Sequence, residues 1–226
     1  MSSINIIGSG NMASAIGALA VRGGNAVEII GRDAAKAAAL ASALGSGATA
    51  GTWGAGPAGD IVILAVLFDS AVPVVSQYGD ALANKIIVDI TNPFNPSVTR
   101  LAVPDDTSIA HMVAEAAPRS AHVVKAFNTL FRDVLAGGGQ LDVFIAGDDA
   151  QAKASVSAFI KSLGLRPQDT GDLSMAHWLE GAGLLSGGLG RYGRGASTSP
   201  LASKPAETQS SGTDVGRGIT PGVGGA

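Results

Sequence analysis

The chain of 226 residues has a formal net charge of −3 and no cysteine, which excludes disulfides and cysteine-ligated metals. No run of Lys or Arg forms a basic stripe, and this argues against a nucleic acid or an anionic membrane surface as partner. Because no apolar stretch reaches the roughly 18 residues of a spanning helix and no basic segment precedes the first apolar run, we expect a cytoplasmic protein without a membrane anchor.

Short β-branched runs alternate with alanine-rich stretches along the first 170 residues. The β-branched runs are almost continuously apolar, as strands buried on both faces of a parallel sheet must be. This alternation predicts an α/β fold, a Rossmann-type doubly wound parallel sheet in a nucleotide-binding domain of residues 1–170. Strands are expected at 4–7, 27–30, 61–66, 86–90, 123–127 and 143–146, and helices at 13–21, 34–44 and 150–163.

The composition changes toward the carboxyl terminus. A short extended piece at 165–169 leads into an amphipathic stretch at 173–185, which predicts a small helical C-terminal appendage over 171–190. Beyond about Gly187 the chain is rich in Gly, Ser, Thr and Pro and almost without bulky apolar side chains. Because such a segment cannot offset its ordering entropy, we expect residues 191–226 to form a disordered tail.

The stretch Gly8-Ser9-Gly10-Asn11-Met12-Ala13 matches the dinucleotide fingerprint G-x-G-x-x-A and stands between a predicted strand and a predicted helix. In that fingerprint Gly8 permits the tight turn, Gly10 lets the backbone approach the pyrophosphate, and Ala13 lets the helix pack close to the strand. The alternative is an ordinary strand-to-helix turn that uses glycine for its positive φ.

The end of the second strand decides between NAD and NADP. The chain reads Ile30-Gly31-Arg32-Asp33, and Arg32 is placed to form a forked hydrogen bond to a 2′-phosphate, with Ser9 and Lys36 as additional contacts. These residues favour NADP(H). Asp33 turned inward would instead bind an unphosphorylated ribose, and Asp33 turned outward would only cap the next helix.

The motifs GSGNMA, GRD, LAV, DITNPF, VVKAFNT and AGDD occur in that order. In this series the chain resembles the NADPH-dependent F420 reductase family over about residues 4–185, and it is similar to the reductase domain of the STEAP metalloreductases. The resemblance implies an NADP(H)-dependent oxidoreductase whose hydride acceptor is a deazaflavin (F420) or a flavin-like molecule. It also implies that Ala65 and Val66 border the nicotinamide and that the phosphates are lined by Ser9, Asn11, Met12, Arg32 and Lys36.

Three predicted strand ends should meet at one crevice, because ligands in open α/β sheets bind outside the carboxyl ends of strands. Amides, hydroxyls and flat apolar rings there suit a stacked heterocycle that receives hydride without a protein nucleophile. Turn formation and helix capping are the alternative role of these Asn, Pro and Thr residues. The candidate acceptor pocket is Thr91, Asn92, Pro93, Phe94, Phe127, Asn128 and Thr129, with Asn92 and Ala126 also facing the cofactor.

No catalytic side chain and no metal site are expected. His111 and His177 are isolated histidines with ordinary hydrogen bonds, and Lys125, inside an apolar strand, must reach solvent or find a partner. We expect a homodimer that acts on a small-molecule acceptor. Two other functions remain open: an enzyme like pyrroline-5-carboxylate reductase, whose opening GSGNMASAI resembles, and a non-catalytic sensor or scaffold that binds NADP.

Overall fold

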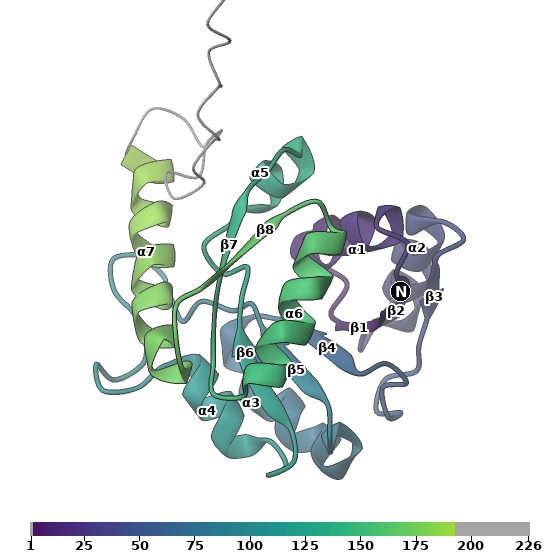
Figure 1. The fold of residues 1–226 in the computed structure, drawn as a ribbon, viewed down its shortest axis with the longest axis horizontal. Helices are drawn as coiled ribbons and strands as arrows, with labels where there is room; N and C mark the ends of the chain where they lie inside the picture. Colours follow the sequence, from purple (N-terminus) through teal and green to yellow (C-terminus); the bar gives the residue numbers. More distant parts are fainter. Residues whose placement is uncertain (1, 193–226) are drawn as a thin grey trace, which may run out of the picture.

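The computed structural model describes residues 2–192, and its centre is an eight-stranded sheet in the order β3-β2-β1-β4-β5-β6-β7-β8 (Figure 1). All neighbours are parallel except β6 and β7. The Rossmann-type α/β prediction is therefore confirmed, with a mostly parallel sheet. The strands are β1 (Ser3–Ile7), β2 (Ala26–Ile30), β3 (Ala48–Ala50), β4 (Ile61–Leu64), β5 (Ile86–Asp89), β6 (His122–Lys125), β7 (Asp142–Gly147) and β8 (Arg166–Asp169).

The antiparallel pairing of β6 and β7 differs from the expected parallel sheet. A parallel return needs a crossover that carries the chain back along the sheet. The only helix between these two strands is α5 (Arg132–Gly137), which has 6 residues and is roughly 9 Å long at 1.5 Å per residue. The chain therefore turns back at the same end of the sheet and enters β7 in the reverse direction.

Burial explains which strands the sequence reveals. All four residues of β4 are buried, and β1 is buried except near its start, so both appear as apolar runs. The edge strand β3 has the sequence ATA and is largely exposed, and it was not expected as a strand. The apolar runs also continue beyond β4, β5 and β6, because the loops that follow contain the buried Ile90, Ala126 and Phe127 and the half-buried Ala65 and Val66.

Seven α-helices and two 3₁₀ helices accompany the sheet in the described chain. Asp33 and Asp149 accept hydrogen bonds from the amides of Lys36 and Ala152, at 3.0 and 2.7 Å, and so cap two of the expected helices. Pro73 lies inside an unexpected helix. The helices are α1 (Asn11–Arg22), α2 (Ala34–Leu44), α3 (Phe68–Tyr78), η1 (Gly79–Leu82), α4 (Ile109–Ala116), α5, α6 (Ala150–Ser162), η2 (Leu173–Met175) and α7 (Ala176–Tyr192).

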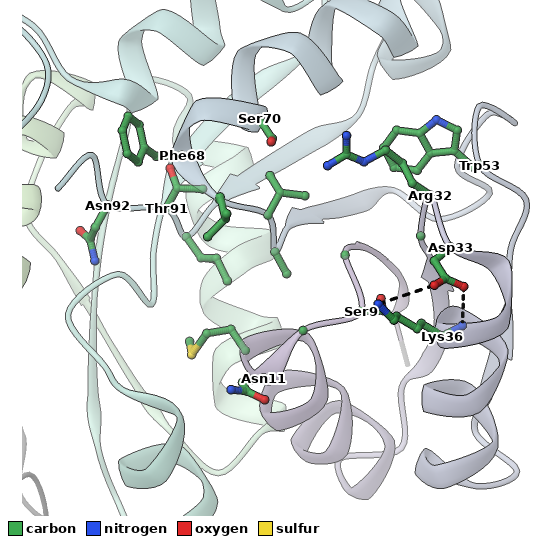
Figure 2. Close-up of a pocket in the computed structure, with 18 residues that line it drawn as sticks. Ser9, Asn11, Arg32, Asp33, Lys36, Trp53, Phe68, Ser70, Thr91 and Asn92 are labelled. Atoms are coloured by element: carbon green, nitrogen blue, oxygen red, sulfur yellow. Dashed lines mark hydrogen bonds and ion pairs between the residues drawn. The ribbon is translucent and has the colours of Figure 1, made fainter. Parts of the chain in front are cut away.

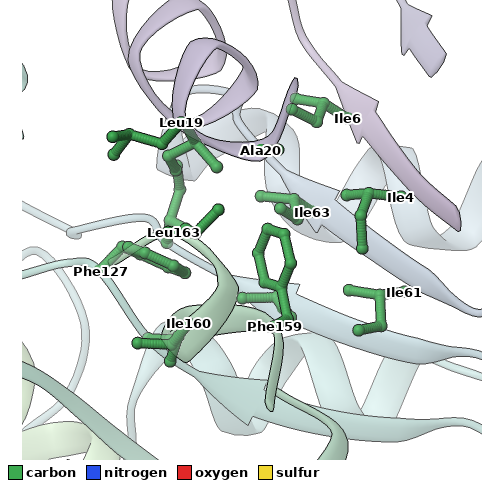
Figure 3. Close-up of a cluster of buried hydrophobic side chains, with 14 of the residues drawn as sticks. Ile4, Ile6, Leu19, Ala20, Ile61, Ile63, Phe127, Phe159, Ile160 and Leu163 are labelled. Carbon is green, nitrogen blue, oxygen red and sulfur yellow. The ribbon is translucent and has the colours of Figure 1, made fainter. Parts of the chain in front are cut away.

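The sheet has one apolar cluster on each face. The larger cluster joins β1 and β4 to α1 and α6, and in Figure 3 Phe159 lies among Ile4, Ile61 and Ile63. The second cluster packs α3 and α4 against the opposite face. The two layers of helices fix the strand ends, and therefore the loops that follow them, in place.

The carboxyl-terminal helix is longer than expected. Instead of one helix from 173, the short η2 leads into α7, which continues to Tyr192. Arg191 and Tyr192, expected in the tail, thus belong to this helix, and residues 193–226 of the expected tail lie outside the described residues. Within residues 2–192, no helix has the length and apolarity to cross a membrane.

Candidate functional site

A cavity of about 570 Å³ opens at the carboxyl ends of β1, β2, β4 and β5 (Figure 2). After β1 the chain builds β2 and β3 on one side, and it later adds β4 on the other side. The cavity therefore lies at the point where the strand order reverses, which is where open α/β sheets bind ligands. Its walls come from the β1–α1 turn, the β2–α2 turn, the β4–α3 turn, the residues after β5, and Trp53.

The two glycines of the β1–α1 turn have different roles. Gly8 has φ +131°, and a Cβ there would lie 2.1 Å from the carbonyl oxygen of Ala65, so glycine is required by the protein's own packing. A Cβ on Gly10 would meet no atom of the described chain within 4 Å. Gly10 is exposed and lines the cavity, so it leaves space that a diphosphate would fill.

The amino terminus of α1 offers amides to an anion. Among the described residues, no side chain caps this helix at Gly10, and its first turn contains no acidic residue. In contrast, α2 and α6 begin with capping aspartates. Uncapped amides at a helix start are unsatisfied donors at the positive end of the helix dipole. Because residues 10–12 line the cavity, this end suits a phosphate.

The cationic side chains of the cavity lie after β2. Asp33 accepts the amide N–H of Lys36 and contacts its ammonium at 3.6 Å. The backbone hydrogen bond from Lys36 is the main cause that lowers the pKa of Asp33. Asp33 thus caps α2, and the alternative in which it turns inward to a ribose is not the conformation observed. The Arg32 guanidinium lies over the ring of Trp53, 6.0 Å from its centroid.

The opposite end of the cavity has a different chemistry. It is lined by the residues after β4, from Ala65 to Phe68 with Ser70, and by Ile90, Thr91 and Asn92 after β5. Among the described residues that line this end, none is ionisable. The cavity is thus polarised, with its charged side chains Arg32, Asp33 and Lys36 at one end and apolar and amide groups at the other.

Residues 3–93 match the model of a protein family described as NADP oxidoreductase, coenzyme F420-dependent. The chain is 31% identical over 130 residues to the F420-dependent NADP reductase of Methanocaldococcus jannaschii, covering 54% of this chain and 58% of that protein. Residues 3–93 are therefore similar to the F420-dependent NADP oxidoreductase family. This confirms the resemblance to F420 reductases that the sequence motifs indicated.

Two further relatives extend the comparison. The chain is 29% identical over 180 residues to the metalloreductase STEAP3 of Rattus norvegicus, covering 78% of this chain and 35% of that protein. The crystal structure of a putative F420-dependent NADP reductase from an Arthrobacter species has a TM-score of 0.75 at 25% identity, covering 84% and 94% of the two chains. The chain thus spans about a third to three fifths of the length of the curated relatives it matches.

The candidate acceptor residues divide into two groups. Thr91 and Asn92 line the cavity. Asn128 lies beside them, because the Asn92 side-chain amide donates to the carbonyl of Asn128 at 2.7 Å and Asn128 Nδ2 donates back to Asn92 Oδ1 at 3.0 Å. Asn128 Nδ2 also donates to the carbonyl of Leu179 in α7 at 2.7 Å. This hydrogen-bonded pair, Asn92 and Asn128, joins the ends of β5 and β6 to α7.

The expectation that Phe127 and Ala126 face the ligand is wrong. Both are fully buried. Phe127 has φ +60°, and its ring packs edge-on against Phe159 in the core, with centroids 6.4 Å apart (Figure 3). An alternating strand pattern would have placed this ring on the other side, but the left-handed backbone conformation redirects it.

The remaining candidates also lie away from the cavity wall. Pro93 and Thr129 are buried, and Phe94 forms an isolated bridge with Leu101. In the described chain these three residues do not line the cavity beside β5.

Lys125 finds carboxylate partners in the interior. Its ammonium donates to Asp89 Oδ2 at 2.8 Å, to Glu180 Oε1 at 2.8 Å and to the carbonyl of Thr91 at 2.6 Å, and all three donors are thereby used. Burial raises the pKa of Glu180, and the charge of Lys125 opposes this rise. Glu180 also accepts the amide of Ile109 at the start of α4. This network fixes Thr91 at the cavity edge.

The two histidines have ordinary hydrogen bonds. His111 Nδ1 lies 3.1 Å from Ser108 Oγ, and His177 Nδ1 donates to the carbonyl of Thr107 at 2.8 Å. The part of the chain that the structure describes contains no group of three or more His, Asp or Glu residues that could hold a metal ion.

Sequence reasoning missed three residues of this region. Asp89 is the parallel register partner of Lys125, so a buried lysine in one strand could have pointed to it. Glu180 comes from α7, 55 positions after Lys125, and no local pattern pairs the two. Trp53 belongs to the loop after β3, and a single tryptophan in a Gly-rich loop carries no signal of its own.

Proposed function

We propose that the protein is an NADP(H)-dependent oxidoreductase that transfers hydride between NADPH and a deazaflavin (F420) or flavin-like acceptor. The observation that carries the proposal is the polarity of the cavity. Cationic side chains lie at the end of the cavity that follows β2, and the uncapped backbone amides of α1 lie at its middle. Apolar and side-chain amide groups lie at the end that follows β4 and β5.

The residues present fit NADP(H) in this order. Arg32 and Lys36 would bind the 2′-phosphate, because a guanidinium forms forked bonds to phosphate oxygens. The α1 amides and the open space at Gly10 would bind the diphosphate. Ala65 and Val66 would border the nicotinamide, where small side chains leave space for a flat ring. When bound, NADPH supplies the hydride.

The chain's own residues then orient the acceptor and exclude water. Hydride transfer between two flat rings depends on close approach and fixed orientation, and it needs no protein nucleophile. Thr91 and Asn92 offer a hydroxyl and an amide beside the apolar wall. Their positions are fixed by the Asn92–Asn128 hydrogen bonds and by Lys125, so the acceptor meets preorganised groups.

The test mixes NADPH with F420, FMN, a ferric chelate or pyrroline-5-carboxylate in parallel and follows the absorbance of NADPH. Oxidation with F420 or FMN supports the proposal. Oxidation only with pyrroline-5-carboxylate or with the ferric chelate would contradict the proposed acceptor. Tight NADPH binding without oxidation in any tube would make the protein a nucleotide sensor instead.

We also propose that the protein acts as a homodimer. Trp178, Leu185, Leu189 and Tyr192 of α7 are 44 to 77% exposed, and such apolar groups on one helix suit burial against a second copy. Light scattering on the full chain measures the mass directly. A monomer at micromolar concentration would refute this proposal.

A further inference from the structure

The side chain of Arg32 is restrained by an aromatic ring rather than by a carboxylate. Its Cζ atom lies 6.0 Å from the ring centroid of Trp53, and both side chains border the cavity (Figure 2). Within residues 2–192, no ion pair of Arg32 is found, and the neighbouring Asp33 contacts Lys36. Arg32 is exposed, so the indole ring is what limits its motion.

Trp53 is itself held by α3. Its ring meets the ring of Tyr78 edge-on, with centroids 5.7 Å apart and an angle of 84°. The amide of the next residue, Gly54, donates to the Tyr78 hydroxyl at 3.1 Å. Burial raises the pKa of Tyr78, so the hydroxyl stays protonated at neutral pH. The loop that carries Trp53 is thereby fixed to the last turn of α3.

An aromatic partner has a different consequence from a carboxylate partner. A carboxylate would occupy the N–H groups of the guanidinium and compete with a phosphate for them. A ring contacts the flat face of the guanidinium and leaves all five N–H groups available. Trp53 therefore restrains the long, flexible side chain of Arg32 while its hydrogen-bonding edge stays open.

We propose that Trp53 is a specificity-determining positioning residue, which holds Arg32 ready for the 2′-phosphate of NADP(H) and so sets the preference over NAD(H). This inference rests on the proposed function, because it requires NADP(H) in this cavity. The physical basis is preorganisation: the conformational freedom of Arg32 is reduced before the ligand arrives, so less is lost on binding.

The experiment measures dissociation constants of NADPH and NADH by calorimetry for the wild type, Trp53→Leu, Arg32→Ala and the double variant. Leucine keeps an apolar contact with Tyr78 but removes the π face. We expect Trp53→Leu to weaken NADPH binding about two- to fivefold and to leave NADH binding unchanged. In the Arg32→Ala background, Trp53→Leu should change neither constant.

Two controls separate positioning from folding. Unchanged NADH affinity shows that the cavity of Trp53→Leu is folded, and Trp53→Phe, which keeps a ring, should restore part of the NADPH preference.

The outcomes distinguish the two proposals. Equal weakening of NADPH and NADH by Trp53→Leu would mean that the ring contacts the adenine directly and would overturn the inference. The inference would also be overturned if Trp53→Leu weakened NADPH binding as much in the Arg32→Ala background as in the wild type. If the wild type binds neither nucleotide, or shows no preference for NADPH, the proposal that NADP(H) is the cofactor is wrong, and the proposed role of Trp53 is wrong with it.

Discussion

Gly183 is the residue at which α7 packs against the hydrogen-bonded pair Asn92 and Asn128. A Cβ at this position would lie 2.7 Å from Asn92 Oδ1, 3.1 Å from Asn92 Nδ2 and 3.2 Å from the carbonyl of Asn128. Real Cβ atoms essentially never show contacts below 3.0 Å, so we expect Gly183→Ala to displace the Asn92 amide. That amide is held by hydrogen bonds of 2.7 and 3.0 Å, which the displacement breaks.

The change in the free energy of unfolding follows from two opposing contributions. Losing two hydrogen bonds costs about 1 to 3 kcal/mol at 0.5 to 1.5 kcal/mol each. Replacing Gly by Ala inside a helix stabilises by about 1 kcal/mol. We therefore expect Gly183→Ala to be destabilised by about 0 to 2 kcal/mol. Because Asn92 lines the cavity, acceptor turnover should fall while NADPH affinity changes little.

Gly181→Ala is the matched control in the same helix. A Cβ at Gly181 would meet no described atom within 4 Å, so only the helix preference applies and we expect a gain of about 0.5 to 1 kcal/mol. Urea unfolding of both variants, with NADPH oxidation kinetics, makes the comparison. If Gly183→Ala gains as much stability as Gly181→Ala and keeps full turnover, the packing of α7 on Asn92 is not as described.

Four further predictions concern the cofactor end and the buried network. Arg32→Ala should raise the KM for NADPH far more than the KM for NADH, and equal changes in steady-state kinetics would refute the 2′-phosphate role. Gly10→Leu should leave the melting temperature nearly unchanged, because the site is open at Cβ, yet weaken NADPH binding at least about tenfold by filling the diphosphate space. Gly8→Ala should destabilise the fold because of Ala65, and a melting temperature like that of the wild type would contradict this. Lys125→Met should cost about 3 to 5 kcal/mol at neutral pH, because two buried carboxylates lose their cation. Burial already raises the pKa of Glu180 and Lys125 opposes the rise, so without Lys125 the carboxyl favours its protonated form more strongly. Because the pKa of Glu180 is raised in the folded protein, protonation of this carboxyl favours the folded state. Its contribution to stability is complete below the ordinary pKa of 4.5 and is lost as pH rises through the higher pKa of the folded protein. The free energy of unfolding of Lys125→Met, measured with urea, should therefore approach that of the wild type as pH falls. A difference between the two proteins that stays constant with pH would refute the reasoning.

The parts of the site that follow from the sequence are those that depend on neighbours along the chain. The glycine turn, Arg32 and the uncapped start of α1 lie within single strand–turn–helix units, where spacing alone determines the geometry. Thr91 and Asn92 could be predicted at the cavity because the carboxyl ends of parallel strands share one edge. Asp89 could have been found by the same reasoning, since it lies beside Lys125 in the register.

Other features depend on contacts between distant segments or on a single backbone angle. The φ of +60° at Phe127 turns its ring into the core, and no residue pattern predicts a positive φ for a phenylalanine. Glu180, Leu179 and Gly183 reach the strand ends only because α7 packs there. Trp53 meets Arg32 across two loops, and the short α5 reverses β7.

The attachment of α7 has a consequence for any attempt to shorten the protein. The sequence places a division near residue 170, yet Glu180 neutralises a lysine that is fully enclosed by the sheet, and it also satisfies the first amide of α4. A fragment cut at that division would leave the ammonium of Lys125 with one carboxylate fewer and the first amide of α4 without its acceptor. The helix α7 is therefore an integral part of the fold, because its Glu180 supplies a charge that the buried Lys125 needs.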